Sequence, residues 1–331
     1  MSSGRIVAVA SSCDETAVAV VERGRRIVAN VVASQVQLHS ATGGIVPEVA
    51  ARAHLRWMIP VLEEARERSG IDDWSGVDAV AVTEGPGLAG SLLVGITMAK
   101  TLAWSLDLPL VPVNHLEGHI YAAWLLDPDE AEKPAPEFPL VAMVVSGGHT
   151  FIVEMQDHLR YRLLGQTVDD AAGEAFDKVG RLLGLSYPGG PAIMKAAAGA
   201  TAHDHRFPRA WMGESYDFSF SGLKTAARHE VAEALGLPAE TRELDSADLS
   251  EQDVAELAWA FQDSVVDVLT SKLLRAARET GARSIILGGG VAANTVLRER
   301  IDEGARGLGL PLIVPRPGLC TDNAAMIGAA G

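Results

Sequence analysis

The alternation of hydrophobic and polar blocks along this chain predicts a mixed α/β protein. Short apolar runs bounded by turn residues are typical of strands, whereas apolar residues spaced three and four apart are typical of helices. The first part of the chain is expected to form three strands, a helix, a strand, a helix and a strand, over residues 5–10, 17–21, 27–33, 49–69, 77–82, 92–106 and 108–113. A polar turn, residues 11–16, joins the first two strands.

A proline-rich acidic stretch, residues 127–138, is the best candidate for a linker, and the pattern repeats after it. Residues 7–16 align without a gap on residues 141–150, and Leu-Pro-Leu at 108–110 recurs at 310–312. Because the order of elements recurs as well, we expect two homologous α/β lobes. The expected boundaries are 1–134 for the first lobe, 135–314 for the second, about 166–225 for a helical insertion, and about 315–331 for a segment that packs near the first lobe.

Two histidines stand one helical turn apart at His115 and His119, directly after a predicted buried strand. Side chains at i and i+4 share one helix face, so both imidazoles can reach a single ion. The repeat places Asp322 at the equivalent junction of the second lobe, which predicts a divalent metal across an inter-lobe cleft. Taken alone, the histidine pair is more simply explained as two satisfied polar side chains.

Two glycine turns are candidates for holding an anion. One, Ser146-Gly147-Gly148-His149-Thr150, joins two predicted strands, and the other, residues 288–290, opens a helix predicted over 291–307 that contains Asn294. Free backbone N–H groups at such turns can cradle phosphate, although an ordinary hairpin turn also explains paired glycines. Asp177 is a candidate acceptor for hydroxyl groups, or simply an exposed helical carboxylate.

The composition restricts the classes of function. A net charge of −15 over 331 residues repels polyanions on average, so binding to nucleic acid requires a local basic patch or a partner. Two cysteines form no disulfide framework, and no apolar run approaches the roughly 20 residues of a membrane span, which predicts a cytoplasmic protein without membrane contact.

Acids crowded between residues 240 and 256 predict a solvated face, and Ser250 and Asp253 predict a helix N-terminus.

Ten motifs in order resemble the TsaD family of tRNA N6-adenosine threonylcarbamoyltransferases. They occupy residues 12–16 (Ser-Cys-Asp-Glu-Thr), 43–48, 84–88, 114–119 (Asn-His-Leu-Glu-Gly-His), 145–150, 169–178, 187–191, 218–225, 289–294 and 321–326 (Thr-Asp-Asn-Ala-Ala-Met). The resemblance spans essentially the whole chain. It implies a duplicated actin/Hsp70/sugar-kinase (ASKHA, ribonuclease-H-like) fold with an inter-lobe active-site cleft.

The same resemblance implies the reaction and its participants. A threonylcarbamoyl group would pass from threonylcarbamoyl-AMP to N6 of the adenosine beside the anticodon, in tRNAs that read codons beginning with A. One Fe(II) or zinc ion per subunit is implied, with tRNA, a TsaB-like paralogue and a TsaE-like ATPase as partners. The implied metal ligands are His115, His119 and Asp322, the implied adenylate contacts are Val144, Val145, Ser146, Gly147, Gly148, Asp177, Gly190 and Asn294, and further cleft candidates are Ser12, Glu15, His149 and Gly289.

Two positions depart from the family pattern. Ala10 stands where relatives usually have Glu, and Thr42 stands where an aromatic residue is common. Three alternatives follow from the residues: an ATPase or kinase of this fold from the glycine turns, a metalloprotease from the histidine pair, and a non-catalytic scaffold from Ala10. The spacing is not His-Glu-x-x-His, which counts against the protease.

Overall fold

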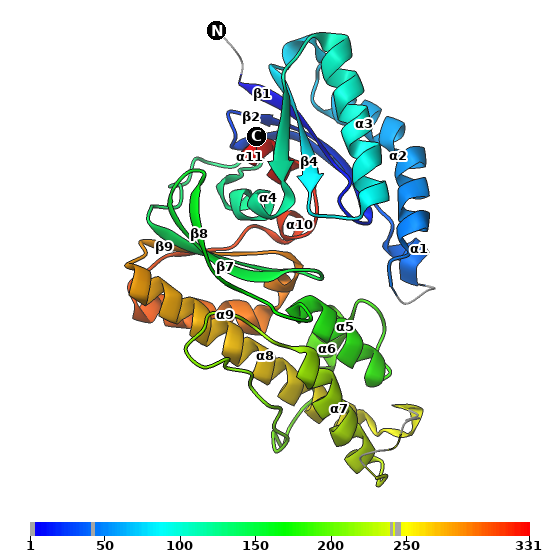
Figure 1. The fold of residues 1–331 in the computed structure, drawn as a ribbon, viewed down its shortest axis with the longest axis vertical. Helices are drawn as coiled ribbons and strands as arrows, with labels where there is room; N and C mark the ends of the chain where they lie inside the picture. The colour runs from blue at the N-terminus through cyan, green and yellow to red at the C-terminus, as the bar shows by residue number, and fades with distance from the viewer. Residues whose placement is uncertain (1–3, 41–43, 239–240, 242–245) are drawn as a thin grey trace. The chain divides into compact units, whose positions relative to one another are not determined.

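A computed structural model describes residues 4–40, 44–238, 241 and 246–331, so Thr42 lies outside the described residues. The chain divides into two compact units, Met1–Pro136 with Pro315–Gly331, and Glu137–Val314. Each unit contains one five-stranded sheet with helices (Figure 1). The fold class is therefore α/β with two lobes.

The first unit has the sheet order β3-β2-β1-β4-β5, in which β1 is antiparallel to β2 and parallel to β4. Every strand and helix expected from the pattern is present, with ends shifted by a few residues. The elements are β1 (Arg5–Ala10), β2 (Glu15–Glu22), β3 (Arg26–Ser34), α1 (Val36–Ser40), α2 (Pro47–Arg68), η1 (Trp74–Gly76), β4 (Ala79–Gly85), α3 (Ala89–Leu106), β5 (Leu110–Asn114), α4 (His115–Tyr121), η2 (Ala122–Trp124), α10 (Pro317–Cys320) and α11 (Ala324–Ala330).

The two faces of this sheet carry side chains of different size, because successive residues of a strand point to opposite faces. Val7 and Val9 of β1 pack in the core beneath α2 and α3, whereas Ala8 and Ala10 pack toward α11. The small alanine face allows close approach of the C-terminal helix: a Cβ on Gly328 would lie 2.8 Å from a Val21 methyl group. The small alanine side chains therefore allow the last segment of the chain to pack directly on the first sheet.

The second unit repeats this topology, with the sheet order β10-β9-β6-β7-β8. Its central strands pair as in the first sheet, since β6 is antiparallel to β7 and parallel to β9. The duplication inferred from the sequence is thus present in the strand order. The elements are β6 (Leu140–Val145), β7 (Thr150–Asp157), β8 (Arg160–Gln166), α5 (Ala172–Leu182), α6 (Gly189–Ala197), α7 (Ser221–Ala234), η3 (Ser246–Asp248), α8 (Glu251–Thr280), β9 (Ser284–Gly288), η4 (Gly290–Ala293), α9 (Thr295–Gly307) and β10 (Leu312–Ile313).

Two sequence-based predictions in the second unit are corrected by the structure. The helix expected from residue 291 begins at Thr295, because Asn294 is its N-cap: the backbone is extended there and Oδ1 accepts a hydrogen bond from Leu297 N. Glu256, the last acid of the supposedly solvated run, is only 6% exposed. Its carboxylate accepts hydrogen bonds from the N–H groups of Thr201, Ala202 and His203, and these bonds hold its pKa at about 2.

One described helix, α3, is long and apolar enough by length and composition to cross a membrane. It packs against α2, β1 and β4, yet only 28% of it is buried. Large apolar side chains on its outer face and on that of α2 are exposed, among them Leu93 and Trp104. Leu55 and Ile59 of α2, which belong to the apolar periodicity of that helix, are also exposed rather than in the core.

Candidate functional site

The histidine pair is positioned by the junction between β5 and α4. Asn114 ends the strand and caps the helix, since its Oδ1 accepts a hydrogen bond from Leu116 N at 2.9 Å. The helix therefore begins at His115, and His119 follows one turn later on the same face. Both side chains are buried, with 5% and 1% exposure.

Asp322 is held by the turn between α10 and α11. The next residue, Asn323, is fully buried; its Oδ1 caps α11 at Met326 N, and its Nδ2 donates to Thr321 O at 2.8 Å. Helix α11 packs on α4 at Gly118, where a Cβ would lie 2.9 Å from the end of the Ile327 side chain. The close approach of these two helices brings Asp322 to the histidines.

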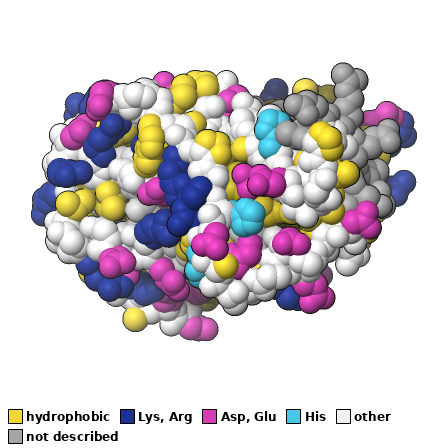
Figure 2. Space-filling view, turned by 90° about the horizontal axis from the view of Figure 1, so that it is seen from below, with side chains coloured by type: hydrophobic (Ala, Val, Ile, Leu, Met, Phe, Trp, Pro, Cys, Tyr) yellow, Lys and Arg dark blue, Asp and Glu magenta, His cyan; other side chains and the backbone are white. Residues whose placement is uncertain are grey.

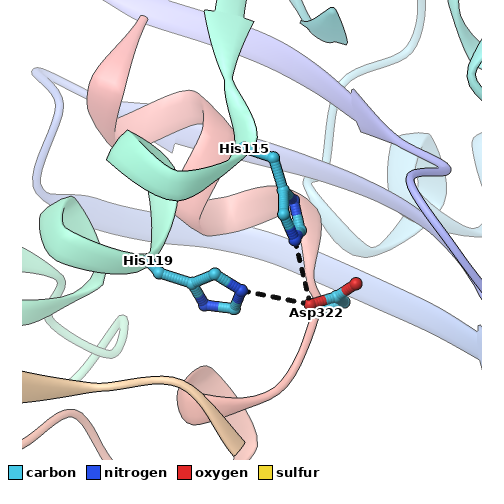
Figure 3. Close-up of side chains that lie close together, drawn as sticks. All are labelled: His115, His119 and Asp322. Carbon is cyan, nitrogen blue, oxygen red and sulfur yellow. Dashed lines mark ion pairs between the residues drawn. The ribbon is translucent and has the colours of Figure 1, made fainter. Parts of the chain in front are cut away.

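All three predicted metal ligands meet at this point (Figure 3). Asp322 Oδ1 lies 3.4 Å from His115 Nε2 and 3.2 Å from His119 Nε2. The repeat predicts ligands from both lobes, and that prediction is wrong, because Pro315–Gly331 belongs to the first unit and so supplies Asp322 from the same unit as the histidines. Among the described residues, this is the one group of three or more His, Cys, Asp or Glu with metal-binding geometry.

The electrostatics of the triad favour the protonation states that a cation requires. Burial lowers the pKa of His119 and outweighs the neighbouring carboxylate, so its imidazole is neutral at pH 7. Burial alone would raise the pKa of Asp322, but the two adjacent imidazole rings outweigh it and hold that pKa well below its usual value. A neutral imidazole and an ionised carboxylate are the forms that bind metal.

The first hairpin turn brings further polar groups to the first unit's site. Ser12 Oγ donates to Asp322 Oδ2 at 3.1 Å, an interaction between residues 310 positions apart. Glu15 accepts from Ser34 Oγ through Oε1, while its Oε2 is buried without a partner among the described residues. Burial outweighs the Ser34 hydrogen bond and raises the pKa of Glu15 to about 8. Ala10, by contrast, is buried in the alanine cluster beneath α11.

In the second unit, the predicted anion loop is the turn between β6 and β7. Val144 and Val145 are fully buried in the sheet, so their side chains are not available to a ligand. Ser146 Oγ accepts from His149 N and thereby tightens the turn. No described atom lies within 4 Å of a Cβ placed on Gly147 or Gly148, which leaves the turn open on that side.

The second glycine turn and α5 both touch this loop. Gly289 adopts φ +86° and ψ 164°, a conformation nearly restricted to glycine, and a Cβ there would lie 2.4 Å from Val145 O. Gly173 of α5 is equally close to Ser146 O, and its N–H donates to that oxygen at 3.2 Å. The structure therefore brings the two predicted glycine turns together.

The remaining predicted adenylate contacts lie around the N-termini of α6 and α9. Asp177 Oδ1 accepts from Gly189 N at 2.7 Å, next to Gly190, and burial raises the pKa of this carboxyl. Asn294 donates through Nδ2 to buried Gln262 at 2.8 Å. A cavity of about 390 Å³ is lined by Gln262 and Thr295, which are the hydrogen-bond partner and the chain neighbour of Asn294, and by residues that include Met194, Lys195, Trp259 and Arg300.

Sequence reasoning missed the residues that support the ligands rather than the ligands themselves. Asn323 follows Asp322 as a helix N-cap, and an Asn before an apolar run is a signal that could have been recognised. Gln262 and Gly118 carry no local signal, because each is defined by a contact with a distant segment. Arg209 pairs with Asp263 and Asp267 on α8.

A family model described as tRNA N6-adenosine threonylcarbamoyltransferase (TsaD) matches residues 26–329 of this chain. The chain belongs to this family. It is 54% identical to the enzyme of that name from Thermomicrobium roseum, over 98% of this chain and 90% of the relative. It is 51% identical to the one from Symbiobacterium thermophilum, over 100% of this chain and 92% of the relative.

Similarity to solved structures supports the fold alone. The crystal structure of HypF from T. kodakarensis superposes with a TM-score of 0.62 at 14% identity, over 99% of this chain and 47% of that one. The predicted ASKHA class is confirmed by this similarity together with the two equivalent sheets. The family assignment makes the chain a transferase that modifies tRNA. It favours this function over the kinase, protease and scaffold alternatives.

Proposed function

We propose that His115, His119 and Asp322 bind the divalent metal ion of this threonylcarbamoyltransferase, Fe(II) or zinc. The observation that carries the proposal is the convergence of three ligand atoms within 4.8 Å of one another. Three imidazole nitrogens, His115 Nδ1, His119 Nδ1 and His119 Nε2, are buried without a hydrogen-bond partner among the described residues. Buried nitrogens without partners are costly, and an ion would satisfy the one that faces Asp322.

The donor set and the spacing both fit such an ion. Two ligand atoms that each lie about 2.1 Å from one ion are separated by roughly 3.0–3.4 Å at tetrahedral or octahedral angles. The distances of 3.2 and 3.4 Å agree with that range. Two imidazoles and one carboxylate suit iron or zinc and leave coordination positions for substrate.

The bound ion would supply Lewis acidity that polarises substrate oxygens. The protein's own part is to hold that ion and to bind the adenylate. In the second unit we assign adenylate binding to Val144, Val145, Ser146, Gly147, Gly148, Asp177, Gly190 and Asn294, with His149 and Gly289 as neighbours of the loop. Open backbone at Gly147 and Gly148 suits a phosphate.

The glycine loop can be tested without disturbing the fold. Because the space around a Cβ at Gly148 is open, we expect G148A to change stability by less than about 0.5 kcal/mol. If the loop approaches phosphate as proposed, the added methyl should weaken binding of threonylcarbamoyl-AMP by about tenfold, or about 1.4 kcal/mol. Titration calorimetry with AMP or a stable analogue of the adenylate measures this.

The matched control is G222A, a glycine of the same unit whose Cβ position also meets no described atom. This variant should bind the nucleotide as the wild type does. Equal affinities for G148A and the wild type would remove the loop from the adenylate site.

We also propose that tRNA binding requires partner proteins. The net charge is −15, and Figure 2 shows Asp and Glu side chains among Lys and Arg on the face in view. Such a surface attracts a polyanion weakly. A TsaB-like paralogue and a TsaE-like ATPase are the proposed partners, and a tRNA substrate agrees with a cytoplasmic location.

The outer face of α2 and α3 is the surface we assign to the paralogue. Its exposed apolar residues are Leu55 and Ile59 of α2 and Leu93 and Trp104 of α3, two helices that pack side by side (Figure 1). Apolar residues concentrated on one face mark an interaction site. A protein of the same fold would present equivalent helices, as in a symmetric dimer.

Trp104 is 86% exposed, so W104E should leave folding nearly unchanged while weakening binding of the paralogue by more than about tenfold. Biolayer interferometry with the purified partner measures the change. W211E replaces another exposed tryptophan, at 42%, in the second unit and should retain binding. Equal affinities of W104E and W211E for the paralogue would contradict the assignment of this surface.

The transfer reaction itself decides the proposed function. The experiment combines the purified protein, its partners, synthetic threonylcarbamoyl-AMP and unmodified tRNA, and reads the digested nucleosides by mass spectrometry. We expect threonylcarbamoyladenosine to form, to disappear after chelation, and to return with added Fe(II) or zinc. Product formation that is unaffected by chelation would contradict the metal centre, and no product with metal present would contradict the activity.

A further inference from the structure

The two oxygens of the Asp322 carboxylate have different partners. Oδ1 faces the Nε2 atoms of His115 and His119, whereas Oδ2 accepts the hydrogen bond from Ser12. Ser12 is 3% exposed, so water has little access to replace its hydroxyl. Rotation of an aspartate carboxylate about its last torsion is otherwise broad and roughly two-fold.

We propose that Ser12 is a positioning residue of the metal centre, whose hydroxyl sets the rotation of the Asp322 carboxylate so that Oδ1 faces the ion. The inference rests on the proposed metal centre. Outer hydrogen bonds of this kind orient ligands and raise metal affinity. They also hold the ligand side chain in its binding conformation before the ion binds, so that less conformational entropy is lost on binding.

The position of Ser12 does not depend on its own hydroxyl. Its carbonyl oxygen accepts from Leu88 N at 2.8 Å, and Gly87 lies so close that a Cβ there would be 2.5 Å from the same oxygen. The following carbonyl, of Cys13, accepts from Ser91 Oγ at 3.3 Å. Removal of the Ser12 hydroxyl should therefore leave the turn in place and release only the carboxylate.

The neighbouring serine provides a matched control. Ser11 is 2% exposed, and its Oγ donates to Ser91 O at 2.8 Å instead of to the carboxylate. S11A and S12A each delete one buried hydroxyl and one hydrogen bond from the same turn. They differ in whether that bond ends on the metal ligand.

The experiment measures the Co(II) or zinc affinity of the full chain by competition with a chelator, together with the visible absorption of the Co(II) form. We expect S12A to bind the metal about tenfold more weakly and to change the Co(II) spectrum. S12T, which keeps the hydroxyl, should restore both, and S11A should match the wild type.

S12A with wild-type affinity and spectrum would overturn the inference, as would a loss of transfer activity at unchanged metal affinity, which would make Ser12 a substrate contact. H115A separates this failure from that of the metal centre. If H115A also binds metal normally, the three-ligand site itself is wrong. If only H115A loses the metal, the site stands and Ser12 has no part in positioning its ligand.

Discussion

H119A should lower metal affinity by more than about 100-fold, because loss of an outer-shell partner alone already costs about 10–100-fold. His119 is 1% exposed and offers a neutral imidazole whose Nε2 lies 3.2 Å from the carboxylate oxygen that shares the ion. Transfer of the threonylcarbamoyl group should fall with metal occupancy. Elemental analysis of the purified variant and the nucleoside assay measure the two effects.

The fold should survive this substitution. Both imidazole nitrogens of His119 lack hydrogen-bond partners among the described residues, so the alanine variant leaves no new unsatisfied partner behind. H205A is the matched control, since it removes a histidine that pairs with Glu230 in the second unit at 2.8 Å. We expect the control to retain metal and activity. Full metal occupancy in H119A with normal melting would contradict the assignment of this ligand.

G289A should destabilise the second unit by about 3 kcal/mol, from backbone strain and overpacking together. At φ +86° and ψ 164° an alanine is strained, and its Cβ would stand 2.4 Å from Val145 O. Neither the strand end nor the β9 turn can move without breaking the pairing of Val144 with Gly288. Urea denaturation followed by circular dichroism measures the loss.

The adjacent glycine shows whether this effect is specific. Gly290 has no positive φ, and its Cβ position meets no described atom within 4 Å. We therefore expect G290A to change the stability of the unit by less than about 0.5 kcal/mol. Equal unfolding curves for the two variants would show that the two glycine turns do not touch as the structure has them. Because the turns approach there, G289A should also weaken binding of the adenylate in the fraction that remains folded.

The sequence by itself predicted the elements and their duplication. Short continuous apolar runs bounded by turn residues, such as Arg5–Ala10, are typical of buried strands, and the Ser250 capping box stands at the N-terminus of α8. The sequence also predicts the histidine pair, because both ligands lie within one helical turn and their relative position depends only on local geometry. The repeated pattern and the family motifs identify Asp322 as their partner.

Only the tertiary structure decided what holds Asp322 beside the histidines. The alanine face of β1 and β2 and the close approach at Gly118 bring α11 onto the first sheet, and these contacts join residues more than 200 positions apart. Glu256 became a buried acceptor for the same reason, because three backbone N–H groups from a distant loop meet it. Local pattern reports what a residue prefers among its chain neighbours, whereas burial and hydrogen bonding between distant segments depend on packing that no window of sequence contains.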